Sequence, residues 1–174
     1  DEVRNLAALP AHQGVLQRLR TAQQDHARRI RDVGFLPEGE IHTRSQGTTP
    51  CDLGHDDRLY PFERIFATAE LASSLKPESV PQLRQALRDP DSAVRYWAAL
   101  GCLMRGAAAV NSAATDLLTA LGDVSPYVRI AAAWALADSG DKSGAQKALA
   151  VLGEHAPWGK HNVFVSLAAL TAID

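Results

Sequence analysis

Cysteine is scarce in this chain, because only Cys51 and Cys102 among its 174 residues carry a thiol. Two cysteines placed in this way make no disulfide framework and match no redox motif. The chain also lacks any apolar run near the roughly 20 residues that a membrane span needs, so we expect no membrane partner. Neither sign of charge dominates, since the formal net charge is −2, and nothing electrostatic points to nucleic acid as a partner.

A secretory leader is not recognisable at the N-terminus, which begins with the charged stretch Asp-Glu-Val-Arg-Asn and has no methionine. This start suggests a piece of a longer polypeptide, so the cellular compartment cannot be read from it. Apolar residues, in contrast, are abundant at 46% of the chain. This fraction excludes a disordered tail and indicates one folded domain, or one domain with an appendage.

The most informative stretch is 89–106, which returns in altered form at 123–140, an offset of 34 residues. Both copies contain an aspartate at a turn, a helix with the pattern Val-Arg-x-x-Ala-Ala and a final glycine. The matched positions include Asp89 with Asp123, Arg95 with Arg129, and Gly106 with Gly140. Self-similarity at a fixed period is typical of repeat proteins, in which helical units stack on one another.

The hydrophobic pattern divides the chain into three parts. In 1–38, apolar residues recur every three or four positions from Val15 to Val33, which predicts a long amphipathic helix with a basic outer face. Glycines, a proline and paired threonines mark 39–60 as an irregular loop. Pro61 then opens a helix, and about three and a half helical repeats fill 61–174.

The period and the Val-Arg-x-x-Ala-Ala pattern resemble HEAT-like repeats. This resemblance implies an all-α fold, a short right-handed α-solenoid with an N-terminal amphipathic helix and a long loop. Residues 1–38 resemble the C-terminal end of the catalytic domain of arylsulfatase-like sulfatases. The similarity lies in the stretch Asp-Glu-Val-Arg-Asn-Leu-Ala at the start and in Arg-Asp-Val-Gly-Phe-Leu-Pro-Glu after the helix. It implies the C-terminal region of a bacterial sulfatase, with a periplasmic or secreted parent.

The residues that the sulfatase reaction needs are missing from this chain. That family uses a Cys-x-Pro-x-Arg segment, whose cysteine becomes formylglycine, and a calcium site built from early aspartates. Cys51 is followed by Asp-Leu-Gly-His, and Cys102 by Leu-Met-Arg-Gly. We therefore expect no catalytic residue and no cofactor here, and the activity of the parent sulfatase would lie upstream.

Two cysteines remain to be interpreted. Cys51 and His55 could both reach a zinc ion, but no second pair with ligand spacing supports them, and a polar surface loop is the favoured interpretation. Cys102 falls opposite Leu136 at the repeat offset, which predicts a buried thiol that packs like a small hydrophobic side chain.

Charged residues recur at the repeat junctions, namely Asp89, Arg95, Asp123 and Arg129. Arginines at the same place in consecutive repeats could form a ligand-binding ladder, as solenoids bind partners with stacked side chains. The favoured interpretation is structural: each arginine bridges two turns through a carboxylate such as those of Asp89 and Asp123.

The first helix of each repeat carries a second apolar face, opposite the stripe expected to face the core. A helix that is apolar all round is buried all round, so we expect another body on this face. That body would be the helix at 15–33 with its following loop, or a surface from a partner or an upstream domain. The alternative is that these side chains lie in solvent. The face comprises Tyr96, Leu100, Leu103, Ile130 and Trp134.

Two functions are compatible with this sequence. The first is a non-catalytic C-terminal module of a sulfatase, which packs on its own upstream catalytic domain or on another protein. The second is a free-standing HEAT-like adaptor or scaffold unrelated to sulfatases. A homodimer is compatible with both. The complete reading frame separates them, because an upstream Cys-x-Pro-x-Arg segment would favour the sulfatase.

Overall fold

The computed structural model describes residues 5–174, and within them it contains eleven α-helices and no β-strand. The chain is therefore all-helical over this range, as the sequence predicts. It divides into two units, one that ends at Asp32 and one that spans Val33–Asp174. None of the described helices is both long enough and apolar enough to cross a membrane.

The first unit contains a single long helix, α1 (Gln13–Ile30), which follows a short 3-10 turn at Pro10–His12. The helix thus ends three residues before Val33, the last position of the apolar pattern seen in the sequence. Arg31 takes the left-handed conformation, with φ 53° and ψ 53°, and its N–H still bonds the last carbonyls of the helix. The apolar stripe of α1 is exposed: Val15 at 43%, Leu19 at 61% and Ile30 at 47%.

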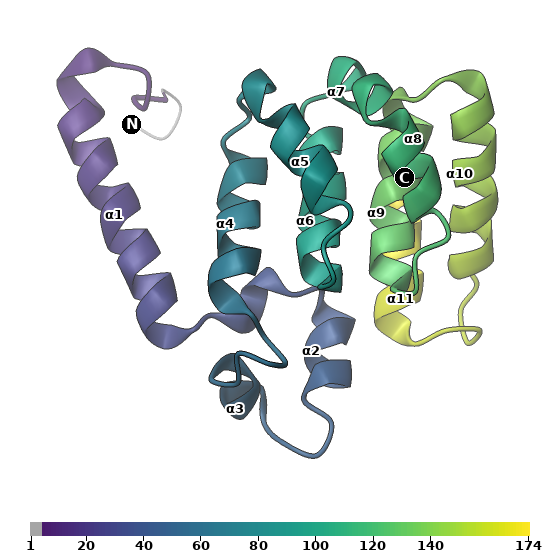
Figure 1. Cartoon of the computed structure of the whole chain (residues 1–174), viewed down its shortest axis with the longest axis horizontal. Coiled ribbons are helices and arrows are strands. Elements are labelled where there is room, and N and C mark those ends of the chain that lie inside the picture. Colours follow the sequence, from purple (N-terminus) through teal and green to yellow (C-terminus); the bar gives the residue numbers. More distant parts are fainter. Residues whose placement is uncertain (1–4) are drawn as a thin grey trace. The chain divides into compact units, whose positions relative to one another are not determined.

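The second unit is built from two layers of helices (Figure 1). In the first layer, neighbouring helices pack in chain order: α4 (Phe62–Ser73), α6 (Ser92–Leu103), α9 (Pro126–Ser139) and α11 (Val163–Ile173). The second layer packs against them and comprises α5 (Val80–Ala86), α7 (Ala107–Ser112), α8 (Ala114–Ala120) and α10 (Lys142–His155). The two copies of the repeated sequence thus form α6 and α9 and the turns before them.

Local capping explains where the first-layer helices begin. The side chain of Asp91 accepts a hydrogen bond from the N–H of Ala93 at the start of α6, and Asn162 accepts from Val165 at the start of α11. α9 begins with Pro126, whose missing N–H costs nothing at the first helical position. In the second layer, the chain between α6 and α9 forms two short helices, α7 and α8.

Small side chains fill the space between the layers. The alanine pairs of the repeat, Ala98-Ala99 and Ala132-Ala133, are fully buried, and so are Cys102 and Leu136. Gly101 shows how close the layers are, because a Cβ there would lie 2.8 Å from a methyl carbon of Leu83 on α5. Close helix packing therefore depends on alanine and glycine along the inner face of α6.

The stretch 39–60, expected to be an irregular loop, contains two short helices, α2 (Glu38–Arg44) and α3 (Pro50–Gly54). The reason is local at α3, where Pro50 occupies the first helical position. Thr49 and Asp52 form a reciprocal capping box around it, since each side chain bonds the backbone N–H of the other. The glycines and proline of this stretch thus mark helix ends as well as turns.

Candidate functional site

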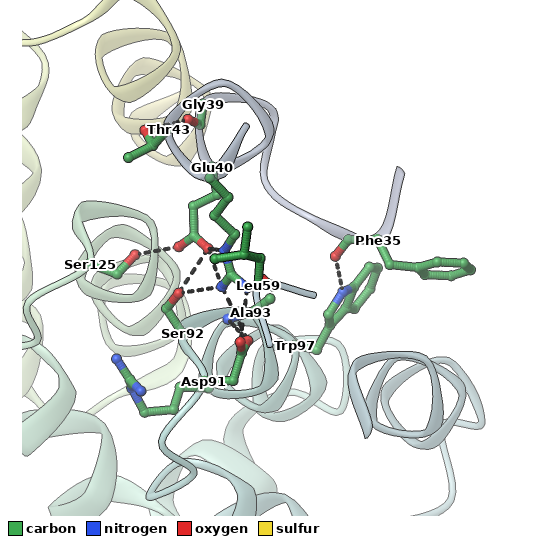
Figure 2. A network of polar contacts seen from close by, with 12 residues as sticks. Phe35, Gly39, Glu40, Thr43, Leu59, Asp91, Ser92, Ala93, Trp97 and Ser125 are labelled. Atoms are coloured by element: carbon green, nitrogen blue, oxygen red, sulfur yellow. Dashed lines mark hydrogen bonds and ion pairs between the residues drawn. The ribbon is translucent and has the colours of Figure 1, made fainter. Parts of the chain in front are cut away.

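Glu40 on α2 is the centre of a polar network at the N-terminal ends of α6 and α9 (Figure 2). Its carboxylate is buried, with 7% of the residue exposed. One oxygen accepts a hydrogen bond from the hydroxyl of Ser125, and the other accepts from the hydroxyl of Ser92, both at 2.8 Å. Ser125 is the N-cap of α9 and Ser92 the first residue of α6, so the helix dipoles favour a negative charge here.

Arg44 extends this network to the turn before α6. Its guanidinium donates to Glu40 at 2.7 Å and to Asp91 at 2.8 Å, and it also donates to the carbonyl of Leu59. Burial opposes the charge of Arg44, yet the hydrogen bond to Asp91 and the carboxylate of Glu40 raise its pKa above the usual value. These contacts fasten the segment 33–60 to the ends of the first-layer helices.

Phe35 covers another part of the first layer. Its ring packs edge-on against Phe66, with centroids 5.1 Å apart, and lies 6.4 Å from the ring of Trp97. The indole N–H of Trp97 donates to the carbonyl of Phe35 at 2.7 Å. Trp97 was not among the expected face residues, although it lies beside Tyr96 in the sequence.

The uncovered part of the face is an apolar groove of about 470 Å³ between α6, α9, α11 and the start of α2. Seven of its lining residues are large and apolar or aromatic: Tyr96, Leu100, Tyr127, Ile130, Trp134, Phe164 and Leu167. Among the described residues that line it, only Glu38 carries a charge, and its side chain is 64% exposed. We call this surface the apolar groove.

The structure brings four of the five expected face residues into the apolar groove. Tyr96, Leu100 and Trp134 are half-buried there, while Ile130 is 3% exposed. Leu103 lies elsewhere and packs against the main hydrophobic core. Helix α11, whose stretch 163–173 contains no charged residue, also lines the groove with Phe164 and Leu167, which were not among the five expected face residues.

Among the junction residues, Arg95 and Asp123 form a bidentate ion pair, which joins α6 to the turn before α9. The Nε of Arg95 donates to one oxygen of Asp123 at 2.6 Å, and Nη2 donates to the other at 2.8 Å. Both side chains are largely buried, with exposures of 12% and 10%. One turn earlier in the chain, Arg64 on α4 lies 3.7 Å from Asp89. A first-layer arginine thus meets an aspartate at the start of the next first-layer helix.

Arg129 does not repeat this contact. The expected contact of Arg129 with a carboxylate such as Asp123 is absent from residues 5–174, where Asp123 pairs with Arg95. Within residues 5–174, the Nε of Arg129 is buried and makes no hydrogen bond. Sequence reasoning could not foresee this difference, since Arg95 and Arg129 occupy the same repeat position.

The metal candidates lie together on α3 but do not form a ligand set. Nδ1 of His55 donates to the backbone carbonyl of Cys51 at 2.8 Å, and both residues are exposed. No three histidine, cysteine or acidic residues of the described chain are grouped so that they could hold a metal ion. Cys102 is fully buried in the core, and burial raises the pKa of its thiol to about 11.

The chain matches no protein-family model, no curated protein and no solved structure. The resemblance to sulfatases over 1–38 and to HEAT-like repeats over 61–174 therefore stays a prediction. Function has to be argued from the apolar groove and the polar contacts around it.

Proposed function

We propose that Val33–Asp174 is a non-catalytic protein-interaction module, and that the apolar groove is its binding surface. The same proposal includes its architecture, a short α-solenoid of HEAT-like repeats. Two observations support the solenoid: the sequence repeats at an offset of 34 residues, and successive first-layer helices pack side by side. Repeats of this kind present continuous surfaces to their partners.

The apolar groove is the single observation that carries the binding role. Tyr96, Trp134 and Phe164 are aromatic residues of the kind that anchor protein interfaces. On the same helix as Phe164, Leu167 and Leu170 are 50% and 47% exposed. Adjoining apolar side chains on a surface mark an interaction site rather than an ordinary solvated face.

Its lining favours binding over catalysis. The described lining residues include no histidine, cysteine, lysine or serine. The hydroxyl of Thr171 donates to the carbonyl of Leu167 and that of Tyr127 to the amide oxygen of Asn162, so neither is paired with a general base. The charge of Glu38 at the rim favours a partner that brings apolar side chains into the groove and a basic side chain to its edge.

The partner that we propose is an upstream catalytic domain of the same polypeptide, as the sulfatase resemblance of 1–38 implies. The apolar groove could be covered by another domain of the same polypeptide or by a separate protein. A free-standing adaptor that binds another protein is the second candidate, supported by the same groove. The two differ in what the complete reading frame encodes upstream.

The test replaces two leucines by arginine. The two leucines have similar exposed fractions but lie in different layers. Leu167→Arg places a charge in the apolar groove, whereas Leu149→Arg places one on α10, where Leu149 is 56% exposed. The upstream domain, if encoded, is expressed separately and titrated with each variant by calorimetry. We expect Leu167→Arg to abolish binding and Leu149→Arg to leave it intact.

Equal binding by both variants would contradict the groove as the binding surface. A reading frame without an upstream sulfatase domain would remove that partner and leave the adaptor as the proposal.

A further inference from the structure

We infer that Arg129 and the turn after α10 bind a carboxylate group supplied from outside the chain. This site shares no lining residue with the apolar groove, so the inference goes beyond the proposed function. It depends on a comparison of three equivalent positions within the chain.

The first two positions hold an aspartate two residues before the N-cap of a first-layer helix. Asp89 precedes the N-cap Asp91, and Asp123 precedes the N-cap Ser125. Each aspartate accepts the backbone N–H of that N-cap at 2.8 Å and faces an arginine of the preceding first-layer helix. The turn geometry is therefore the same in both places.

The third position breaks the series. The N-cap of α11 is Asn162, and the residue two places before it is Lys160. The whole turn at 156–162 reads Ala-Pro-Trp-Gly-Lys-His-Asn and contains no acidic residue. At the position equivalent to Asp89 and Asp123, the repeat therefore has a lysine in place of a carboxylate.

Two buried polar atoms near this turn have no hydrogen-bond partner within the described chain: Nε of Arg129 and Nε2 of His155. His155 is 1% exposed, and its Nδ1 donates to the carbonyl of Val151 at 2.8 Å. Its ring stacks on that of His161, with centroids 4.9 Å apart. Nε2 of His155 is an acceptor in the tautomer whose Nδ1 donates, so Nε of Arg129 is the donor that is left to meet a carboxylate. Unpaired buried donors are rare in proteins, and this one indicates an interaction still to be made.

The local charge also favours an anion. Burial lowers the pKa of His155, and the positive charge of Arg129 lowers it further. The nearby negative charge is that of Glu154, which lies exposed at the end of α10. Among residues 5–174 it forms no ion pair with Arg129. The positive charge of Arg129 is thus not balanced by any ion pair within residues 5–174.

The filled position defines the ligand. Arg95 presents Nε and Nη2 side by side to the two oxygens of Asp123, which is the geometry that a guanidinium offers to a planar carboxylate. Arg129 occupies the same repeat position, so the group that fits it is a carboxylate. This group can belong to a small organic acid or to an aspartate or glutamate side chain of a protein.

The experiment compares the wild type with Lys160→Asp and Arg129→Gln, and uses Lys76→Asp as the matched control. Lys76 is also an exposed lysine at a turn, so this variant makes the same change of charge elsewhere. The probes are sodium acetate and the peptide acetyl-Gly-Asp-Gly-amide, against sodium chloride at equal ionic strength. The readouts are the NMR signal of the Arg129 Nε–H group and the melting temperature.

We expect acetate or the peptide to shift the Arg129 Nε–H signal in a saturable way in the wild type and in Lys76→Asp. Lys160→Asp supplies its own carboxylate, so it should melt at a higher temperature in chloride and lose the response to both probes. Tighter binding of the peptide than of acetate identifies a protein side chain as the source, and equal binding identifies a small acid.

An Arg129 signal that responds to neither probe at saturation would overturn the inference. The same holds if Arg129→Gln gains as much thermal stability from acetate as the wild type does. Neither result affects the apolar groove, which the Leu167→Arg experiment tests on a separate surface.

Discussion

The hydroxyl of Ser125 donates a hydrogen bond of 2.8 Å to the carboxylate of Glu40, across 85 positions of the chain. Ser125 begins the first-layer helix α9, while Glu40 lies on α2. The same carboxylate accepts from Ser92 at the start of α6. One side chain therefore ties α2 to two successive first-layer helices and holds one edge of the apolar groove in place.

Glu40→Ala should lower the free energy of unfolding by about 3–5 kcal/mol, because it removes one partner of a largely buried ion pair and leaves Ser92 and Ser125 without their acceptor. Glu38→Ala is the control on the same helix, since the Glu38 side chain is 64% exposed and its loss should cost less than about 0.5 kcal/mol. Urea denaturation measures both. Similar values for the two variants would show that the network contributes little to stability.

Two glycine-to-alanine variants should change stability in opposite directions. A Cβ on Gly39 would overlap the hydroxyl group of Tyr127, so Gly39→Ala must displace α2 or that ring and should cost about 1–3 kcal/mol. Gly153 in α10 has no atom within 4 Å of the added Cβ, so Gly153→Ala should stabilise by about 0.5–1 kcal/mol through helix propensity. Melting temperatures that move in the same direction would contradict the close packing of α2.

Arg95→Ala should destabilise more than Arg88→Ala. Arg95 is 12% exposed, and its removal leaves the buried carboxylate of Asp123 without its ion-pair partner, which should cost about 1–3 kcal/mol. The Arg88 side chain is 75% exposed, and its partner Asp116 keeps the ion pair with Arg84, so this loss should stay within about 0.5 kcal/mol. Chemical denaturation of the two variants gives the comparison, and the reverse order would exclude a junction role for Arg95.

The two thiols should differ sharply toward a bulky disulfide reagent. Cys51 is exposed, whereas Cys102 is buried and burial raises the pKa of its thiol to about 11, so little reactive thiolate forms there. Mass spectrometry of the native protein should show one label, on Cys51, and the denatured protein should show two. Two labels at equal rates under native conditions would mean that the core opens readily.

Stability should fall as the pH drops below about 6.5, partly because of His155. Burial and the charge of Arg129 keep its folded-state pKa below the unfolded value, while its bond to Val151 opposes this. In that range the unfolded chain binds a proton that the folded chain does not, so protonation favours unfolding. His155→Leu should flatten the dependence of the melting temperature on pH between 7 and 5. An unchanged slope would show that His155 does not cause the loss of stability.

The helices were predictable because their signals are local. The 34-residue offset, with an aspartate at each turn, marked α6 and α9, since caps and side-chain periodicity act over a few residues. The burial of Cys102 followed from the same offset. Four of the five residues expected on a second apolar face do line the apolar groove, because the angular positions on a helix are set by its geometry alone.

Two features depended on the tertiary structure alone: the position of α2 at the edge of the apolar groove, and the pairing of charged side chains. Glu40 reaches Ser125 across 85 positions, and no local pattern marks a contact of that range. Arg95 and Arg129 look alike in the sequence, yet one has a carboxylate and the other does not. The difference arises because an ion pair depends on the residue that a distant turn places opposite the arginine, whereas a helix depends only on hydrogen bonds between near neighbours in the chain.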